Sequence, residues 1–411
     1  MIFKRKVYNK LLAWKQQTAG TKALLIEGAR RIGKSTLVEE FAKNEYRSYL
    51  LIDFNKVSDS VVSAFNNYMN DLDTFFLILS SEYGVRLYPK ESIIIFDEIQ
   101  QFPKARQAVK YLVADGRFDY IETGSLISIK ENVKDITIPS EERVLLMYPM
   151  DFEEFAWAMG EEPLIAYIRR CFDKKEPLEQ GLHAKAMLLF RQYMIVGGMP
   201  KSLSAYLENN RSFEMADMEK RDILTLYRND IMKIKSGYRS SVLSIFDQIP
   251  AFLSRSERRV VMSRIEKGAS FPKYHDTFFW LSDSMITNEC FNCSDPNVGL
   301  SLNEDRTYVK CYMGDTGLLV SHTFDENEIS DGELYRKILL GKLSVNEGMF
   351  YENVIAQMLV AAGHKLYFYT RYNEEKHRND VEIDFILSNH SKLKYKIFPI
   401  EVKSNDKYTI R

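Results

Sequence analysis

The sequence predicts an α/β fold in which helices alternate with the strands of a parallel sheet. One observation is the apolar run at residues 23–26, which leads directly into the segment G-A-R-R-I-G-K-S-T at residues 28–36. Another is the β-branched run at residues 92–96, which ends in the acidic pair Asp97 and Glu98. Runs this apolar are typical of strands that helices cover on both faces, so we expect a doubly covered parallel sheet.

The segment at residues 28–36 has the phosphate-binding pattern G-x-x-x-x-G-K-[ST], between a strand and a helix as that loop requires. Glycines let the backbone wrap around an anion, and a helix that begins near Lys34 adds the positive end of its dipole. ATP is therefore the expected ligand. Its predicted contacts in this loop are Gly28, Arg31, Gly33, Lys34, Ser35 and Thr36. For Arg30 and Arg31, a solvated loop face is an equally open interpretation.

The acidic pair supplies what ATP hydrolysis needs beyond phosphate binding. Asp97 is expected to hold magnesium together with Ser35, and Glu98 is expected to orient the attacking water. Lys34 would contact the β and γ phosphates. We therefore interpret Lys34, Asp97 and Glu98 as catalytic residues, with ATP and magnesium as cofactors. The alternative, a strand that simply ends in an acidic loop, is disfavoured by the phosphate loop in the same chain.

Three further strands are expected at residues 46–54, 120–125 and 144–148, which gives a sheet of five strands. We expect one of them to lie between the phosphate-loop strand and the acidic strand. That insertion, with Glu beside Asp, is typical of P-loop ATPases of the additional-strand type.

Two features of this region resemble the AAA-type ATPases. Thr123 and Ser125 lie where that class has a polar sensor of the γ phosphate, although Thr-Gly-Ser is also favourable turn chemistry. Arg143 lies near the place of an arginine finger, which implies a catalytic role. However, Glu142 replaces the glycine that relatives often have, and a surface ion pair of Arg143 with Glu141 or Glu142 is the alternative.

Composition limits the remaining classes. A formal net charge of -1 over 411 residues argues against nucleic-acid binding through bulk charge, while a local basic patch stays open, so that bulk charge neither supports nor excludes DNA. No apolar run approaches the roughly 18 residues of a membrane span, and the basic start lacks the apolar core of a signal peptide. Four cysteines fit a reducing, cytoplasmic setting. The C-x-x-C at residues 290–293 has no second pair of zinc ligands, so we expect no zinc site.

Three further motifs extend the resemblance over essentially the whole chain. They are Y-P-M-D-F-E-E-F at residues 148–155, G-G-M-P at 197–200 and M-G-D-T-G-L-L at 313–319. Together they resemble a large group of prokaryotic AAA-type ATPases whose ATPase part is similar to archaeal origin-recognition proteins. That group carries a C-terminal domain of unknown function with a PD-(D/E)xK-like ending. The resemblance implies a P-loop ATPase core at 1–160, a helical lid and winged-helix-like region at 161–310, and a PD-(D/E)xK-like domain at 311–411.

The middle of the chain reads as helical. Apolar residues recur at spacings of three and four from about residue 164 to 235, and shorter helices with a strand near Ile286 follow at 238–300. For the second segment the resemblance implies a winged helix, a module that enters DNA grooves or docks proteins. Its positive charge comes from Arg255, Arg258, Arg259, Arg264 and Lys267. DNA contact is one interpretation of these residues and a solvated helix face is the other.

The last hundred residues hold a second set of candidates. Glu401 and Lys403 close an apolar strand, Asp384 lies in an alternating strand upstream, and Glu352 in a predicted helix could reach the same point. This set resembles the active site of the restriction-endonuclease-like fold. The resemblance implies four catalytic residues, with magnesium on Asp384 and Glu401 and with Lys403 assisting a bound water. Relatives can keep such residues for binding or assembly alone. Only eight residues follow Lys403, so we expect either that the chain is truncated or that the sheet is incomplete.

The motifs together predict a switch or remodeller that binds and hydrolyses ATP and acts on DNA, with a magnesium-dependent, nuclease-like C-terminal module. The alternative is an ATP-dependent signalling or defence switch that acts through protein partners and cuts no nucleic acid. A nucleotide-dependent homo-oligomer is compatible with both, and neither involves a membrane.

Overall fold

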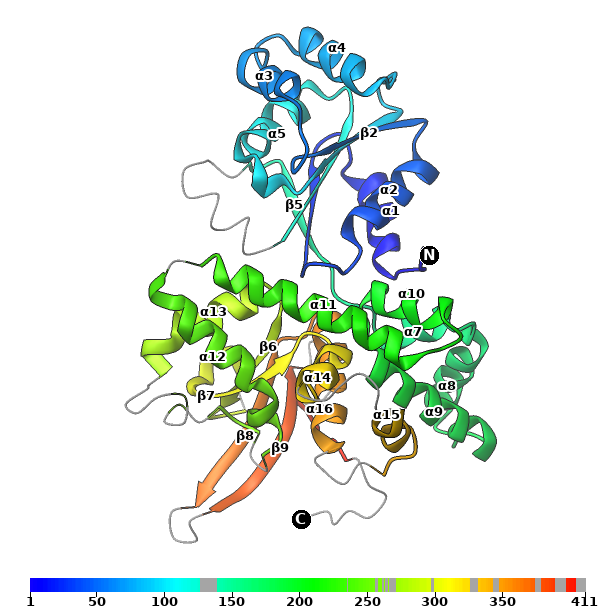
Figure 1. The fold of residues 1–411 in the computed structure, drawn as a ribbon, viewed down its shortest axis with the longest axis vertical. Coiled ribbons are helices and arrows are strands. Elements are labelled where there is room, and N and C mark those ends of the chain that lie inside the picture. Colours follow the sequence, from blue (N-terminus) through cyan, green and yellow to red (C-terminus); the bar gives the residue numbers. More distant parts are fainter. Residues whose placement is uncertain are drawn as a thin grey trace. The chain divides into compact units, whose positions relative to one another are not determined.

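Two compact units, Met1–Tyr148 and Pro149–Arg411, divide the chain, and each is described by itself (Figure 1). The structure is a computed structural model. It describes residues 1–125, 139–234, 236–255, 258–260, 262, 265, 271–296, 299–325, 332–342, 347–373, 378–388 and 397–403. Arg264 and Lys267, named above for their positive charge, lie outside these ranges.

The first unit is built on a five-stranded sheet in the order β2-β3-β4-β1-β5, and every pairing in it is parallel. Its strands are β1 (Ala23–Glu27), β2 (Ser48–Asp53), β3 (Ser92–Asp97), β4 (Asp119–Gly124) and β5 (Glu142–Leu146). Strand β4 lies between β1, which precedes the phosphate loop, and β3, which carries the acidic pair. The predicted α/β fold and the predicted inserted strand are therefore confirmed.

Helices cover both faces of this sheet. On one side lie α1 (Val7–Gln17) and α2 (Lys34–Glu45), and on the other lie α3 (Asp59–Asn67), α4 (Leu72–Tyr83) and α5 (Pro103–Asp115) (Figure 1). A short 3-10 turn, Ile99–Gln101, connects β3 to α5. Helix starts follow from capping residues, since Ser58 accepts from the Val61 N–H at α3 and Asp71 accepts from the Thr74 N–H at α4.

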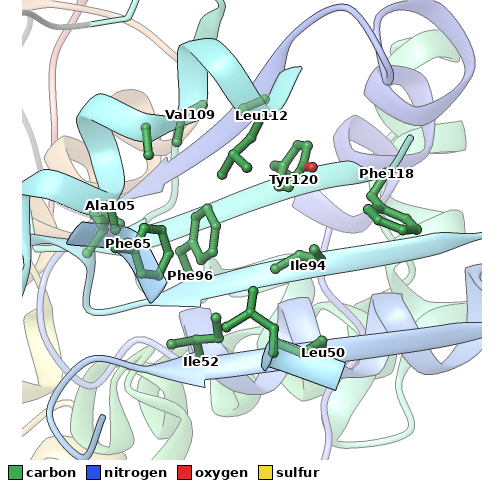
Figure 2. Packing of buried hydrophobic residues seen from close by; sticks show 14 of the residues in the cluster. Leu50, Ile52, Phe65, Ile94, Phe96, Ala105, Val109, Leu112, Phe118 and Tyr120 are labelled. Carbon is green, nitrogen blue, oxygen red and sulfur yellow. The ribbon is translucent and has the colours of Figure 1, made fainter. Parts of the chain in front are cut away.

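Figure 2 shows the side chains of β2, β3 and β4 meeting those of α5 in one apolar layer. Phe96 is fully buried in it, with its ring centroid 5.9 Å from Phe65 and 6.1 Å from Tyr120. Close packing of this kind holds a side chain in one position. Because Phe96 immediately precedes Asp97, the core fixes the end of β3 and therefore the acidic pair.

The second unit begins with helices, as expected for residues 164–235. They are α7 (Phe152–Ala158), α8 (Glu162–Lys174), α9 (Gln180–Val196), α10 (Pro200–Glu208), α11 (Phe213–Met232), α12 (Ser236–Leu253) and α13 (Phe271–Asp283). Asp151 and Glu154 form a reciprocal capping box at the start of α7. Over the described ranges, no helix is both long and apolar enough to cross a bilayer.

A second sheet follows, in the order β10-β9-β8-β6-β7. Its strands are β6 (Thr287–Cys293), β7 (Glu304–Met313), β8 (Leu366–Asn373), β9 (Arg378–Ser388) and β10 (Ile397–Ile400), with a 3-10 turn at Leu300–Asn303. Helices α14 (Thr316–Thr323), α15 (Gly332–Leu339) and α16 (Glu347–Ala361) lie between β7 and β8 in the chain. Strand β6 pairs with β8. One sheet therefore contains residues from both of the predicted parts 161–310 and 311–411. The winged-helix and restriction-endonuclease-like interpretations, like the three-part division, stay predictions.

Two of the sequence motifs meet in the second unit. A side chain at Gly317 would place its Cβ 2.5 Å from the Gly197 Cα, so the two backbones touch where only glycine fits. The buried Asp315 carboxylate accepts from the Gly198 N–H at 2.6 Å and the Leu318 N–H at 3.0 Å. The motifs at 197–200 and 313–319 therefore lock α9 and α10 onto α14.

Candidate functional site

The phosphate loop follows β1 and is held tightly at both ends. A Cβ at Gly28 would lie 2.4 Å from the Met147 carbonyl oxygen, and Gly33 has a φ of 91°, in the left-handed region. Helix α2 begins directly after it, at Lys34. From the N-terminal segment, Arg5 donates to the Ile32 carbonyl in the loop at 3.0 Å, a support that no sequence pattern indicated.

Lys34 is buried inside this loop. Its Nζ donates to the carbonyl oxygens of Gly28 at 3.0 Å and Ala29 at 2.9 Å. Burial lowers the pKa of Lys34 to about 8, although the nearby carboxylates of Glu98 and Asp97 act in the opposite direction. Backbone carbonyl groups of the loop therefore hold the ammonium of Lys34, and its lowered pKa of about 8 lies close to physiological pH.

Asp97 lies at the centre of the site. Its Oδ1 accepts from the Ser35 hydroxyl at 2.7 Å and also from the Thr123 hydroxyl. The three residues come from α2, β3 and β4, whose adjoining ends meet at one edge of the sheet. A hydroxyl and a carboxylate side by side are the ligands that P-loop ATPases use for magnesium, so these residues fit that ion.

Glu98 is held beside Asp97 by two contacts. Its N–H donates to the Thr123 hydroxyl oxygen at 3.4 Å, and the amide of Gln100 donates to its carboxylate. Glu98 itself has a φ of 55°, a left-handed conformation that is uncommon for a residue with a side chain. Sequence reasoning missed the buried Gln100, although its place two residues after the acidic pair was a usable signal.

The remaining predicted ligands divide into two groups. Ser125 is buried one residue beyond β4, two residues after Thr123, while the side chains of Arg31 and Thr36 are exposed. Arg143 is not brought to the site of its own chain. It pairs with Leu24 in the sheet register, three residues before the carboxyl end of β1, which corresponds to about 10 Å along the strand.

The proposed surface partner of Arg143, Glu142, is instead bound by Arg106 from α5 in a two-bond ion pair. Nε and Nη2 of Arg106 donate to the two carboxylate oxygens at 2.9 and 2.7 Å, with only 5% and 2% of the side chains exposed. Glu122 is fully buried nearby. Burial, then the charge of Glu142, raises the pKa of Glu122 well above its ordinary value, whereas Arg106 opposes this rise.

In the second unit, the structure brings Asp384 and Glu401 together. The Val402 N–H donates to Asp384 Oδ2 at 2.9 Å, and the Asp384 N–H donates to Glu401 Oε2 at 3.4 Å. Lys403 donates to Glu401 Oε1. The predicted pairing of a strand acid with the Glu-x-Lys end therefore occurs in space.

Glu352, the remaining predicted acid, is fully buried on α16. Lys310, a residue that the sequence did not indicate, connects it to Asp384. The Nζ of Lys310 lies 3.2 Å from Glu352 Oε1 and 3.7 Å from Asp384 Oδ1. The Tyr312 hydroxyl donates to the same Glu352 oxygen, and Arg258 forms an ion pair with the other. We call Glu352, Asp384, Glu401, Arg258, Lys310 and Lys403 the C-terminal charge cluster.

The charge cluster does not fit the magnesium ion that was predicted for it. Protein donors or cations already lie on the carboxylate oxygens of Glu352, Asp384 and Glu401. Throughout the part of the chain that the structure describes, no three metal-ligating side chains gather in one place. Arg258, which we considered for DNA contact, is committed to Glu352 instead.

Three family models match successive parts of the chain. Residues 20–156 match an AAA domain, residues 187–328 match a domain of unknown function (DUF8612), and residues 347–411 match a domain of unknown function (DUF4143). Among curated proteins, no sequence matches this chain.

Three solved structures illustrate the similarity to known folds. Cdc6p from Pyrobaculum aerophilum is 11% identical over 81% of this chain and 92% of that chain, with a TM-score of 0.28. DnaA from Aquifex aeolicus bound to AMPPCP is 10% identical over 69% and 90%, with a TM-score of 0.27. The RuvB Holliday junction branch migration motor of Thermotoga maritima is 14% identical over 72% and 90%, with a TM-score of 0.29. Because these TM-scores lie below 0.5, the likenesses carry no inference about this chain.

Proposed function

We propose, from the match of residues 20–156 to an AAA domain, that the chain is an ATP-driven switch that acts on DNA through its second unit. One observation carries the ATPase half. Ser35, Asp97 and Thr123 meet at a single carboxylate oxygen beside the phosphate loop. This arrangement joins the loop, the acidic strand and the sensor strand, so that a change at the γ phosphate reaches all three.

Each residue of the site has a role that its position supports. Lys34 binds the β and γ phosphates, which requires its ammonium to leave the carbonyl oxygens of Gly28 and Ala29. Ser35 and Asp97 would hold magnesium, which supplies positive charge to the phosphate oxygens. Glu98 orients the attacking water, and Gln100 and Thr123 hold Glu98 in place.

The proposal of DNA binding rests on a basic side chain, Arg259, that lies beside an aromatic side chain of β7, Tyr308. Arg259 lies with its guanidinium 5.0 Å from the ring centroid of Tyr308, and 41% of Tyr308 is exposed. A guanidinium beside an accessible ring can contact a phosphate while the ring stacks on a base. We propose DNA binding rather than DNA cleavage, because the acids that cleavage would need are already paired with cations of the chain.

Fluorescence anisotropy of labelled single-stranded and duplex DNA, across a range of salt concentrations and with and without ATP, tests this proposal. We expect log affinity to fall linearly with log salt, and Arg259→Ala to weaken binding and to reduce the slope by about 1. Arg47→Ala is the matched control, because Arg47 is exposed in the first unit. Failure of the wild-type chain to retain either DNA at low salt, with or without ATP, would contradict the proposal.

An alternative target is a protein partner or a second copy of the chain. The observation that favours it is Phe172 on α8, of which 82% is exposed, a large apolar side chain of the kind found at protein interfaces. Sedimentation of the chain with and without ATP separates the two candidates. Self-association that depends on ATP, together with no retention of DNA, would favour the alternative.

A further inference from the structure

We propose that the ammonium of Lys310 takes the place of a divalent cation in the C-terminal charge cluster, so that this cluster assembles and works without a metal ion. This inference does not depend on the nature of the partner that the second unit binds. It concerns how the buried acid of α16 and the acid of β9 are compensated.

The position of Lys310 is that of a bridging cation. Its Nζ lies 3.2 Å from Glu352 Oε1 and 3.7 Å from Asp384 Oδ1, and so it joins carboxylates from α16 and β9. Only 1% of the Lys310 side chain is exposed, and its Nζ lies 5.1 Å from the ring centroid of Phe368. A buried ammonium in such surroundings is stable only when it is paired, and here it is paired twice.

Glu352 has the same requirement with the opposite sign. It is fully buried, and an isolated buried carboxylate is very unfavourable. One of its oxygens receives the Lys310 ammonium and the Tyr312 hydroxyl, and the other meets the Arg258 guanidinium. The segment that carries Arg258 is pinned beside β7, because the Val260 N–H donates to the Val309 carbonyl at 2.9 Å.

Asp384 and Glu401 complete the cluster with partners of their own. Backbone N–H groups of Val402 and Asp384 bind one oxygen of each carboxylate, and Lys403 binds the other oxygen of Glu401. Three acids therefore face three bases, and the cluster is electrically balanced. Magnesium needs near-octahedral oxygen ligands at about 2.0–2.1 Å, so it could enter only by displacing Lys310.

Counting of bound Mn²⁺ tests this inference directly. The full chain, without nucleotide, is titrated with Mn²⁺ and the free ion is measured by electron paramagnetic resonance. We expect wild type and Asp384→Asn to bind the same number of ions, because Asp384 already has protein partners. Loss of one bound ion in Asp384→Asn would overturn the inference. Ions held by Ser35 and Asp97 contribute equally to both proteins and cancel.

A second variant tests the converse. Lys310→Met keeps the length of the side chain but removes its charge, which leaves Glu352 and Asp384 undercompensated. We expect this variant to bind one more Mn²⁺ than wild type, and its midpoint of thermal unfolding to rise when Mn²⁺ is added. Lys365→Met is the matched control, because 55% of the Lys365 side chain is exposed, and it should change neither quantity.

A folded Lys310→Met protein with the wild-type number of ions would overturn the inference, and circular dichroism establishes folding. If that variant does not fold, the Asp384→Asn comparison decides. Neither measurement uses DNA or ATP, so failure of the proposed DNA binding and failure of this inference give different results.

Discussion

The Ser35 hydroxyl donates to Asp97 Oδ1 over 2.7 Å, although 62 residues separate the two in the chain. Ser35 is the second residue of α2 and Asp97 is the last residue of β3. Their contact joins the phosphate loop to the acidic strand, and the Thr123 hydroxyl on the same oxygen adds β4. Several consequences of this geometry are open to measurement.

Gln100 should affect the rate of hydrolysis and not the binding of ATP. Its amide donates to the Glu98 carboxylate, to which we assign the orientation of the water, whereas we assign the phosphates to the loop. In steady-state assays we expect Gln100→Ala to lower kcat by roughly tenfold, less than the roughly 100-fold or more that a positioned base itself contributes, with KM unchanged. Gln101→Ala, the exposed neighbour, serves as control. A raised KM with an unchanged kcat would assign Gln100 to binding.

ATP affinity should fall as the pH rises through the pKa of Lys34, which burial lowers to about 8. Above that pH the side chain is neutral and cannot pair with phosphate, so binding must first take up a proton. Calorimetric titrations should show Kd rising by up to about tenfold per pH unit above pH 8. Lys34→Arg stays charged and should lose this dependence. A constant Kd between pH 7 and 9.5 for the wild type would contradict the role of Lys34.

The buried pair of Arg106 with Glu142 should be essential to the stability of the first unit. Arg106→Met leaves the Glu142 carboxylate buried without a partner, close to Glu122, and removal of one partner of such a pair costs about 3–5 kcal/mol. Urea denaturation measures the change. The control is Glu91→Gln, which breaks an ion pair with Arg47 whose side chains are each 55% exposed. Equal effects of the two substitutions would show that burial of the pair does not matter.

Gly317→Ala should destabilise the second unit. The added Cβ would lie 2.5 Å from the Gly197 Cα and 2.7 Å from the Val196 carbonyl oxygen, and overpacking of this kind costs about 1–3 kcal/mol or more. Gly237→Ala is the control, because a Cβ there meets nothing within 4 Å and alanine favours a helix. Thermal unfolding should therefore shift downward for the first variant only, and an unchanged midpoint would show that the two motifs are not locked together.

Much of the first unit could be predicted from sequence because its signals are local. A strand, a glycine loop and a helix follow one another within residues 23–45, and the acidic pair ends its own strand. The order of the strands then follows from the type of ATPase. The family model that matches residues 20–156 confirms the AAA-type interpretation of this part.

The ion pairs could not be predicted, because they depend on register and on burial from both sides. Arg106 meets Glu142 only because β5 adds to the edge of β1 and carries Glu142 beneath α5. Alternation along β7 would place Lys310 toward solvent, but the last five residues of that strand are all buried. The burial of Lys310 follows only from the packing of α16 and β9 around it. Arg143 lies away from the site of its own chain for the same reason, because the register of β5 pairs it with Leu24, and its role as an arginine finger stays a prediction.

The most direct test of the account is ATP turnover by Glu98→Gln, measured beside ATP binding by the same protein. Because the proposal assigns the water to Glu98 and the nucleotide to the loop and Asp97, we expect Kd to stay at the wild-type value. The turnover rate should fall by about 100-fold or more. Glu91→Gln, which alters the residue just before the opposite end of β3, should hydrolyse ATP at the wild-type rate. Wild-type turnover by Glu98→Gln would contradict the central claim that the acidic pair and the phosphate loop form one hydrolytic site.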